Sequence, residues 1–348
     1  MKLGLLVNDP LTEKAGYTTT RLAHVASSMG HEAWCIGVGD FIYVADGSLH
    51  ANAVRPPGKD YKDAAAYHKA RSGDKAVRER IALTDLDVLL LRNDPAEDAI
   101  DRPWAQTSGI LFAELATQRN VLVLNDPSSL ARAMNKTYFQ HFPEAVRPRT
   151  CISRDAEEIK QFISEQKGKA VLKPLQGSGG QSVFLVQSGK DPNTNQMIEA
   201  IVRDGYAIAQ EYLPAAAKGD TRLFVMNGRP LMSGGKYAAI RRVGKKGDVR
   251  NNVHVGGTVK AATIDASTLR LVEMVRPKLV SDGMWMVGLD IVEDKLMEIN
   301  VFSPGGLGTA QGITKKDFVV EVIRDLERKV AFKAYYGGNI PNVALATL

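Results

Sequence analysis

Oxygen-bearing side chains interrupt two short apolar segments near the C-terminal end of the chain. Residues 288–292 and 296–300 read as strands joined by a charged turn, and they carry Asp290, Glu298 and Asn300. Side chains alternate along a strand, so Glu298 and Asn300 share one face. Carboxylates in an apolar sheet are costly unless a cation pairs with them. Because Mg²⁺ prefers oxygen ligands, and Mn²⁺ accepts the same ones, the hairpin predicts a metal site.

The metal prediction depends on the register of this hairpin. A three-residue turn at residues 293–295 pairs Val292 with Leu296, and therefore Asp290 with Glu298. The two carboxylates then face each other, which is repulsive unless a cation lies between them. A two-residue turn would place them on opposite faces of the sheet. The segment would then be an ordinary edge hairpin with solvated charges, and the sequence leaves both interpretations open.

A lysine precedes a glycine-rich segment in the middle of the chain. Residues 170–174 form an apolar strand that carries Lys173, residues 176–180 contain three glycines, and residues 182–186 read as the returning strand. Backbone N–H groups of such a loop can close around phosphate oxygens, and Lys173 would add positive charge. The lysine precedes the glycines, so this is not a Walker A motif. The segment predicts a phosphate-binding loop, with a flexible hairpin as the alternative.

Two further segments could take part in nucleotide chemistry. Residues 209–214 run into a proline and could offer backbone groups to an adenine and Glu211 to a ribose, although a plain strand end reads the same way. Residues 219–225 place Asp220 and Arg222 at the start of a strand. An arginine there can brace a transferring phosphoryl group or form a surface ion pair.

A basic segment over residues 241–252 contains glycines and lacks apolar periodicity. It begins with Arg241 and Arg242 and reads as a mobile loop. As a lid, its cations would neutralise phosphate during turnover. The alternative is an ordinary solvated loop.

Strands and helices alternate in the first third of the chain, which predicts a parallel α/β domain. Three apolar strands there end in Asn-Asp-Pro, at residues 8–10, 93–95 and 125–127. The residues Asn, Asp and Pro favour turns, but the carboxyl ends of strands are also where ligands bind in open α/β sheets. Residues 55–80 are hard to assign. Beyond about residue 125 the pattern becomes α+β with an antiparallel sheet, including a strand over 230–239 and a last helix over 316–330.

Composition favours a soluble protein of two or three domains. The chain has 348 residues, 44% of them apolar and 24% charged, and no apolar run approaches the length of a membrane span. The first ten residues are not a signal peptide, and two cysteines, Cys35 and Cys151, cannot form a disulfide framework. These features predict a cytoplasmic protein. The net charge of +6 is scattered along the chain, which favours small anionic ligands over nucleic acid.

In this order and spacing the segments resemble the ATP-grasp superfamily, and within it the bacterial glutathione synthetases. The resemblance runs from Leu3 to about Val330. Its specific parts are residues 86–95, 171–180, 209–214, 219–222 and 287–304. It implies an N-terminal α/β substrate domain over 1–125 and an ATP-grasp domain over 126–348, with a lid at about 150–213 and a C-terminal subdomain at about 214–335.

The resemblance also implies cofactors and residue roles. ATP and Mg²⁺ would be gripped between the lid and the C-terminal subdomain, with two Mg²⁺ ions held by Asp290, Glu298 and Asn300. The phosphates would contact Lys136, Lys173, Gly177, Ser178, Gly179 and Gly180; adenine and ribose would contact Gln210, Glu211, Tyr212, Leu213 and Asp220. Arg222, with either Arg241 or Arg242, would stabilise the transferring phosphoryl group, and the substrates would contact Arg250, Asn252, Ser303, Gly305 and Gly306.

The implied reaction joins a carboxylate to an amine through an acyl phosphate, with γ-glutamylcysteine and glycine as the default substrates. The chain departs from the family after Pro304. Glutathione synthetases place polar and charged side chains there, whereas residues 305–311 of this chain are rich in glycine. A related ligase with another donor or acceptor, and a nucleotide-binding regulator without turnover, are the alternatives. The sequence does not determine whether the chain forms homo-oligomers.

Overall fold

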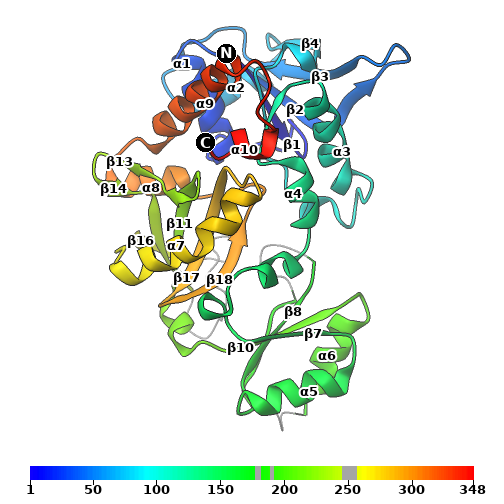
Figure 1. Cartoon of the computed structure of the whole chain (residues 1–348), viewed down its shortest axis with the longest axis vertical. Coiled ribbons are helices and arrows are strands. Elements are labelled where there is room, and N and C mark those ends of the chain that lie inside the picture. The colour runs from blue at the N-terminus through cyan, green and yellow to red at the C-terminus, as the bar shows by residue number, and fades with distance from the viewer. Residues whose placement is uncertain (177–181, 189–191, 245–256) are drawn as a thin grey trace.

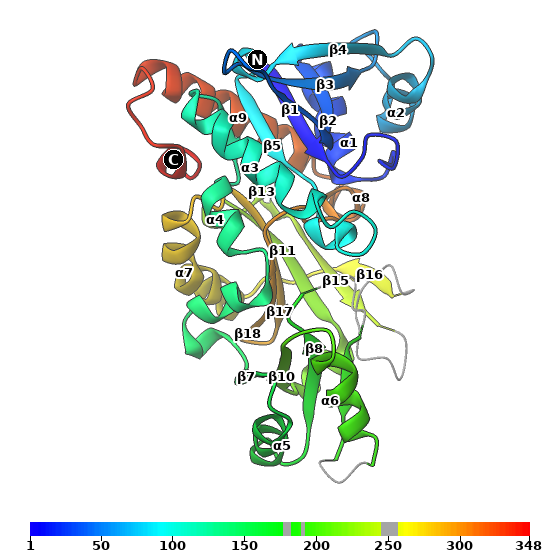
Figure 2. The ribbon, with the colours of Figure 1, turned by 90° about the vertical axis from the view of Figure 1, so that its right-hand side faces the viewer.

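The computed structural model describes residues 1–176, 182–188, 192–244 and 257–348. Its three main sheets follow one another along the long axis of the molecule, with the sheet of the N-terminal segment at one end (Figures 1 and 2). That first sheet has the strand order β4-β3-β2-β1-β5-β6. Strands β2, β1, β5 and β6 are parallel, and β3 and β4 extend the sheet as antiparallel strands. The strands are β1 (Lys2–Val7), β2 (Glu32–Tyr43), β3 (Leu49–Arg55), β4 (Val77–Ala82), β5 (Val88–Leu91) and β6 (Leu122–Leu124).

Both faces of this sheet are covered, which explains the continuous apolar runs of its strands. Leu3 and Leu5 of β1 pack in one core cluster with helices α1 (Thr18–Ser28) and α9 (Phe318–Tyr335). Leu6 of β1 packs in the other cluster with helix α3 (Ala105–Gln118). The last long helix of the chain therefore belongs in space to the N-terminal sheet, beside α1 (Figure 1).

The second sheet lies at the far end of the molecule and has the order β7-β10-β8-β9 (Figure 1). All its neighbouring strands are antiparallel, and helices α5 and α6 pack with it in a separate apolar cluster. We call this unit the lid sheet. Its elements are β7 (Thr150–Ser153), α5 (Ala156–Glu165), β8 (Ala170–Pro174), β9 (Phe184–Val186), α6 (Thr194–Val202) and β10 (Ala207–Glu211).

The third sheet lies between the other two, and we call it the central sheet (Figure 2). Its order is β16-β15-β11-β17-β18, and its strands are antiparallel. Leu223 and Leu289 face helix α7 in the apolar core, so the alternate positions Arg222 and Asp290 face the opposite side. The elements are β11 (Asp220–Met226), β15 (Ala239–Val243), β16 (Thr258–Ala261), α7 (Ala266–Ser281), β17 (Met286–Val292) and β18 (Lys295–Asn300).

Shorter elements connect these units and include several that the sequence did not reveal. The strand expected over 230–239 is broken by a turn at Gly234 and Gly235, both of which have positive φ angles. The unassigned residues 55–80 contain a helix and the start of a strand. These elements include α2 (Ala64–Ser72), α4 (Pro127–Arg132), a 3₁₀ helix (Lys136–His141), β12 (Arg229–Pro230), β13 (Met232–Ser233), β14 (Lys236–Tyr237), α8 (Leu307–Thr314) and α10 (Asn342–Leu345).

The expected parallel α/β sheet and the expected antiparallel sheets are both confirmed. Of the two cysteines, Cys35 is buried and Cys151 is partly buried. In the described part of the chain, every helix is too short or too polar to cross a lipid bilayer.

Candidate active site

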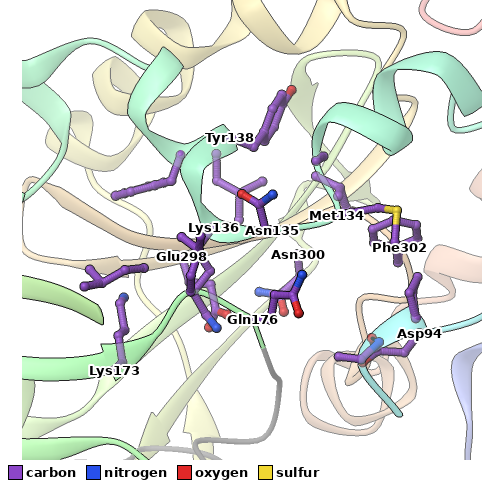
Figure 3. A pocket seen from close by; sticks show the side chains of 18 of the residues that line it. Asp94, Met134, Asn135, Lys136, Tyr138, Lys173, Gln176, Glu298, Asn300 and Phe302 are labelled. Atoms are coloured by element: carbon purple, nitrogen blue, oxygen red, sulfur yellow. Dashed lines mark hydrogen bonds between the residues drawn. The ribbon is translucent and has the colours of Figure 1, made fainter. Parts of the chain in front are cut away.

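A pocket lies where the lid sheet meets the central sheet, and the segment that links the N-terminal sheet to the lid closes one side of it. Figure 3 shows the side chains of Lys136, Lys173 and Glu298 directed toward the same space. Lys173 comes from β8, Glu298 from β18 and Lys136 from the start of the 3₁₀ helix. Three separate parts of the sequence thus supply charge to one cavity. Its lining includes Asp94, Met134, Asn135, Lys136, Phe139, Lys173, Gln176, Ile208, Gln210, Met297, Glu298, Asn300, Phe302 and Ser303.

Each of the two lysines of this pocket donates a hydrogen bond to a neutral acceptor. Lys173 Nζ donates to Gln210 Oε1 at 3.1 Å, and Lys136 Nζ donates to the Pro174 carbonyl at 3.2 Å. Burial lowers the pKa of Lys173 to about 8; the charge of Glu298 opposes this shift and the charge of Lys136 adds to it. Burial also lowers the pKa of Lys136. Two ammonium groups that are partly desolvated and near each other favour a polyanionic ligand, because the ligand restores the charged form of both.

The hairpin of β17 and β18 reaches the expected pairing by a different route. The expected three-residue turn is wrong: Val292 pairs with Lys295, so the turn has two residues. A register shift between Asp290 and Ile291 then leaves Met297 as an extra residue on β18. This β-bulge restores Asp290 to a position opposite Glu298. The two carboxylates therefore do share a face, which the two-residue turn alone would have prevented.

Asp290 is buried and held by two arginines in this structure. Arg222 donates to both of its carboxylate oxygens at 2.7 Å, and Arg242 Nη2 lies 2.8 Å from Oδ2. Burial alone would raise the pKa of Asp290, but the two guanidinium groups hold the pKa below its ordinary value. Asp220 also pairs with Arg242, at 2.7 and 2.9 Å, and burial together with the nearby Asp290 raises the pKa of Asp220. These four side chains form one buried charge network.

The network shows which of the two consecutive arginines faces the site. Arg242 is 5% exposed and lies beside Asp220 in the sheet register, on the face of Arg222 and Asp290. Arg241 pairs with Thr221, points to the other face and donates to the carbonyl of Lys218 at 3.1 Å. Of the two arginines, Arg242 is therefore the one that lies near Arg222.

The donor set on this face fits Mg²⁺. Asn300 uses its amide nitrogen toward Asp290 Oδ2 at 3.2 Å, which leaves its carbonyl oxygen available. Glu298 is exposed at the pocket, opposite Asp290. Asp290 Oδ1 accepts one hydrogen bond, from Arg222, and so retains a lone pair. Within the described ranges, no cluster of three or more His, Cys, Asp or Glu side chains could hold a metal, so an ion here would need the Asn300 oxygen and other oxygens such as phosphate or water.

The other expected site residues are distributed as follows. Gln210 and Ser303 line the pocket, and the carbonyl of Gly305 accepts from Arg222 at 3.4 Å. Glu211 is turned toward the backbone N–H of Arg149 at 3.1 Å, and Tyr212 and Leu213 follow the end of β10. Gly306 has φ 102° and begins helix α8. Gly177, Ser178, Gly179, Gly180, Arg250 and Asn252 lie outside the described residues.

Sequence reasoning missed the pocket residues of the linking segment and the N-terminal sheet. Asp94 lies in the second Asn-Asp-Pro tripeptide and lines the pocket, while Asn8 of the first tripeptide bonds to the Asp94 backbone at 2.8 Å. Asn125 of the third bonds to carbonyls of β17 and of Val301. The first two tripeptides therefore join neighbouring strand ends of one sheet, the third joins that sheet to the central sheet, and the second also contributes to the pocket. The signal for Met134, Asn135 and Phe139 was only their closeness in sequence to Lys136.

Two protein-family models match the chain, and together they cover most of it. The model described as prokaryotic glutathione synthetase, N-terminal domain, matches residues 1–131, and the one described as prokaryotic glutathione synthetase, ATP-grasp domain, matches residues 135–315. The chain belongs to the prokaryotic glutathione synthetase family. It is accordingly an ATP-grasp ligase, an enzyme that forms carbon–nitrogen bonds, as the sequence resemblance implied.

Some relatives in this family align with nearly the whole chain. The glutathione synthetase of Yersinia pestis is 32% identical over 338 residues, which is 96% of this chain and 99% of that protein. That of Gloeobacter violaceus is 31% identical over 334 residues, 93% of this chain and 97% of that protein. That of Vibrio cholerae is 39% identical over a shorter stretch of 228 residues, 65% of this chain and 68% of that protein.

Solved structures support the fold. D-cycloserine synthetase DcsG superposes with a TM-score of 0.60 at 14% identity, covering 93% of this chain and 99% of that one. The ATP-grasp ligase PsnB, solved with a minimal precursor, Mg and ADP, gives a TM-score of 0.58 at 15% identity and covers 94% and 98%. At these identities the likeness concerns the fold alone, and the fold is ATP-grasp.

Proposed function

We propose that this chain is a glutathione synthetase that joins γ-glutamylcysteine to glycine with hydrolysis of ATP to ADP and phosphate. The observation that supports this most strongly is the meeting of Lys136, Lys173 and Glu298 at one pocket beside the Arg222–Asp290 pair. Cations for a polyphosphate and oxygen ligands for a metal lie together, in a chain whose family relatives are glutathione synthetases. No nucleophilic side chain is required for such a ligation.

The ATP phosphates would lie against Lys136 and Lys173, with residues 177–180 covering them. Gln210, Glu211, Tyr212 and Leu213 would hold the adenine and ribose, with Asp220 at the start of the next strand. Asp290, Glu298 and Asn300 would hold Mg²⁺, which supplies neutralisation of phosphate charge when it is bound. Lys173 keeps its charge through contact with phosphate, which offsets its desolvation.

The reaction has two balanced steps. An oxygen of the cysteine carboxylate attacks the γ-phosphorus of ATP, the bond to ADP breaks, and an acyl phosphate forms. The glycine amine then attacks the acyl carbon, phosphate leaves, and the amine loses a proton. Arg222 and Arg242 would stabilise charge on the transferring group, since positioning and charge neutralisation carry most of phosphoryl-transfer catalysis. For this role the two guanidinium groups would share their contacts between Asp290 and the phosphoryl oxygens.

We also propose a cytoplasmic location, since the substrates contain a free thiol and the two cysteines of the chain are unpaired. Among partners we expect small molecules and no nucleic acid, because the basic residues are scattered along the sequence.

The proposal is tested by incubating the purified chain with Mg·ATP, γ-glutamylcysteine and glycine. We expect glutathione by mass spectrometry and one phosphate released per glutathione. Activity only with other carboxylate–amine pairs would replace this substrate assignment with another ligase reaction. Nucleotide binding without phosphate release in any pair would favour a regulator.

A further inference from the structure

Gly308 of helix α8 lies directly against Arg21 of helix α1. Although residues 305–311 are rich in glycine, residues 307–314 form a helix that contacts α1. A Cβ atom built on Gly308 would overlap the Nε atom of Arg21 and lie 2.7 Å from its Cζ atom and 2.8 Å from its Cδ atom. Arg21 therefore occupies the space that the missing side chain of Gly308 leaves. Any larger residue at position 308 would displace its guanidinium.

The guanidinium of Arg21 lacks a partner in the described part of the chain. Its Nε–H group is buried and has no acceptor within hydrogen-bond distance among the described residues. A buried donor without an acceptor is costly, so its presence in a packed helix interface suggests a ligand that is absent from the protein itself. Thr18, one turn earlier on the same helix, also has a buried hydroxyl without a partner. The guanidinium and the hydroxyl are both suited to a carboxylate.

A neighbouring arginine shows the contrasting case. Arg92, at the end of β5, donates to the carbonyls of Phe302 and Pro304 at 3.4 and 3.3 Å and to Thr19 Oγ1 at 3.4 Å. Its contacts hold the backbone just before α8 and connect it to the first turn of α1. Arg92 thus serves the protein's own structure. Arg21 lies in the same first turn of α1, but its side chain makes no such contact among the described residues.

The spacing along the chain links Arg21 to the reacting end of the site. Arg222 bonds to Asp290 and to the carbonyl of Gly305, and Gly308 follows three residues later. Helix α8 begins only at Leu307, and three residues of chain span at most about 11 Å. A dipeptide spans about 7 Å when extended. A donor whose cysteine carboxylate lies at Arg222 would extend its other end toward Arg21.

We propose that Arg21 binds the carboxylate of the donor dipeptide that does not react, the α-carboxylate of its γ-glutamyl residue, and that Gly308 is small in order to leave room for this arginine. The inference rests on the proposed function. Arg21 then determines specificity for a donor with a second carboxylate. A planar guanidinium suits this role because it can donate two parallel hydrogen bonds to one carboxylate.

The first test compares two donors in wild type and R21A. We expect R21A to lower kcat/KM for γ-glutamylcysteine roughly 10- to 100-fold, since hydrogen bonds between charged groups contribute this much. With 4-aminobutanoyl-cysteine, which lacks the α-carboxylate, R21A and wild type should be equal. The KM values for ATP and glycine should not change. R21K should recover part of the loss, because it restores charge without the planar fork.

The second test leaves Arg21 in place and removes its space. G308A should lower kcat/KM for γ-glutamylcysteine in the same donor-dependent way, and the double variant R21A/G308A should be no worse than R21A. G312A is the matched control: it lies in the same helix and nothing lies within 4 Å of its Cβ position, so it should match wild type. Alanine favours a helix over glycine, so neither variant is expected to unfold α8.

Several results would overturn the inference while leaving the proposed function intact. One such result is that R21A is as active as wild type on γ-glutamylcysteine. Another is that R21A loses activity on both donors by the same factor. A rise in the glycine KM alone would assign Arg21 to the acceptor instead. If wild type makes no glutathione, the proposed function itself has failed, and that outcome is visible before any variant is measured.

Discussion

Asp290 and Glu298 lie opposite each other on neighbouring strands, although the turn between those strands has only two residues. The extra residue Met297 restores the pairing. The two carboxylates nevertheless have different surroundings. Asp290 is buried against two arginines, whereas Glu298 is exposed at the pocket. Substitutions at the two positions should therefore have different consequences.

We expect E298Q to lower turnover by orders of magnitude with little loss of stability. The substitution removes a charge that faces the pocket and leaves no buried group without a partner. Turnover is measured as phosphate release with saturating Mg·ATP, and stability as the thermal unfolding midpoint. Activity in E298Q comparable to wild type would refute the metal assignment.

D290N should lower both activity and stability. It leaves Arg222 and Arg242 buried without their shared carboxylate, and breaking such a pair from one side costs about 3 kcal/mol or more. Because the arginines hold the pKa of Asp290 below its ordinary value, the stabilising contribution is present at neutral pH and is lost as pH falls through the folded-state pKa. Measured by urea unfolding, the difference in the free energy of unfolding between wild type and D290N should become smaller below about pH 4. A difference in the free energy of unfolding that does not change with pH would contradict this prediction.

Arg241 and Arg242 provide a matched pair of neighbours. R242A should destabilise the protein by about 3 kcal/mol and abolish turnover, since it leaves Asp220 and Asp290 short of a buried partner. R241A should change stability by less than about 1 kcal/mol, because Arg241 is on the other face and partly exposed. Unfolding midpoints and phosphate release distinguish the two. Equal losses of stability and turnover in R241A and R242A would show that the face of the sheet on which each arginine lies does not determine its role.

Nucleotide affinity should depend on pH through Lys173. Burial lowers the pKa of Lys173 to about 8, so the free protein loses this charge as pH rises above that value. ATP favours the charged form, and its affinity should therefore fall by up to about tenfold per pH unit between about pH 8 and about pH 10. Calorimetric titration at several pH values measures this. K173R stays charged, so its affinity for ATP should depend less on pH. The same pH dependence in K173R and wild type would assign the titration to another group.

The sequence predicted the fold well where periodicity carries the information. The apolar runs of β1 and β5 indicate strands buried on both faces, and the structure covers both faces with helices. Residues 307–314 were not predicted as a helix because glycine has low helix propensity, and tertiary contacts with α1 and the central sheet overcome this.

The candidate site was predictable in its residues and not in its geometry. Alternation placed Arg241 and Arg242 on opposite faces, but only the register with β11 shows which one meets Asp290. The bulge at Met297 has no signature in the sequence, so the correct pairing of Asp290 was expected for the wrong turn. The role of Gly308 required the position of Arg21, which lies 287 residues earlier in the chain.

The most direct test of the central claim follows an oxygen atom. γ-Glutamylcysteine labelled with ¹⁸O in its cysteine carboxylate is converted with Mg·ATP and glycine, and the phosphate and glutathione are analysed by mass spectrometry. Ligation through an acyl phosphate predicts one labelled oxygen in the phosphate for each glutathione formed. Unlabelled phosphate, or phosphate released without glutathione, would contradict the assignment of this chain as a glutathione-forming ligase.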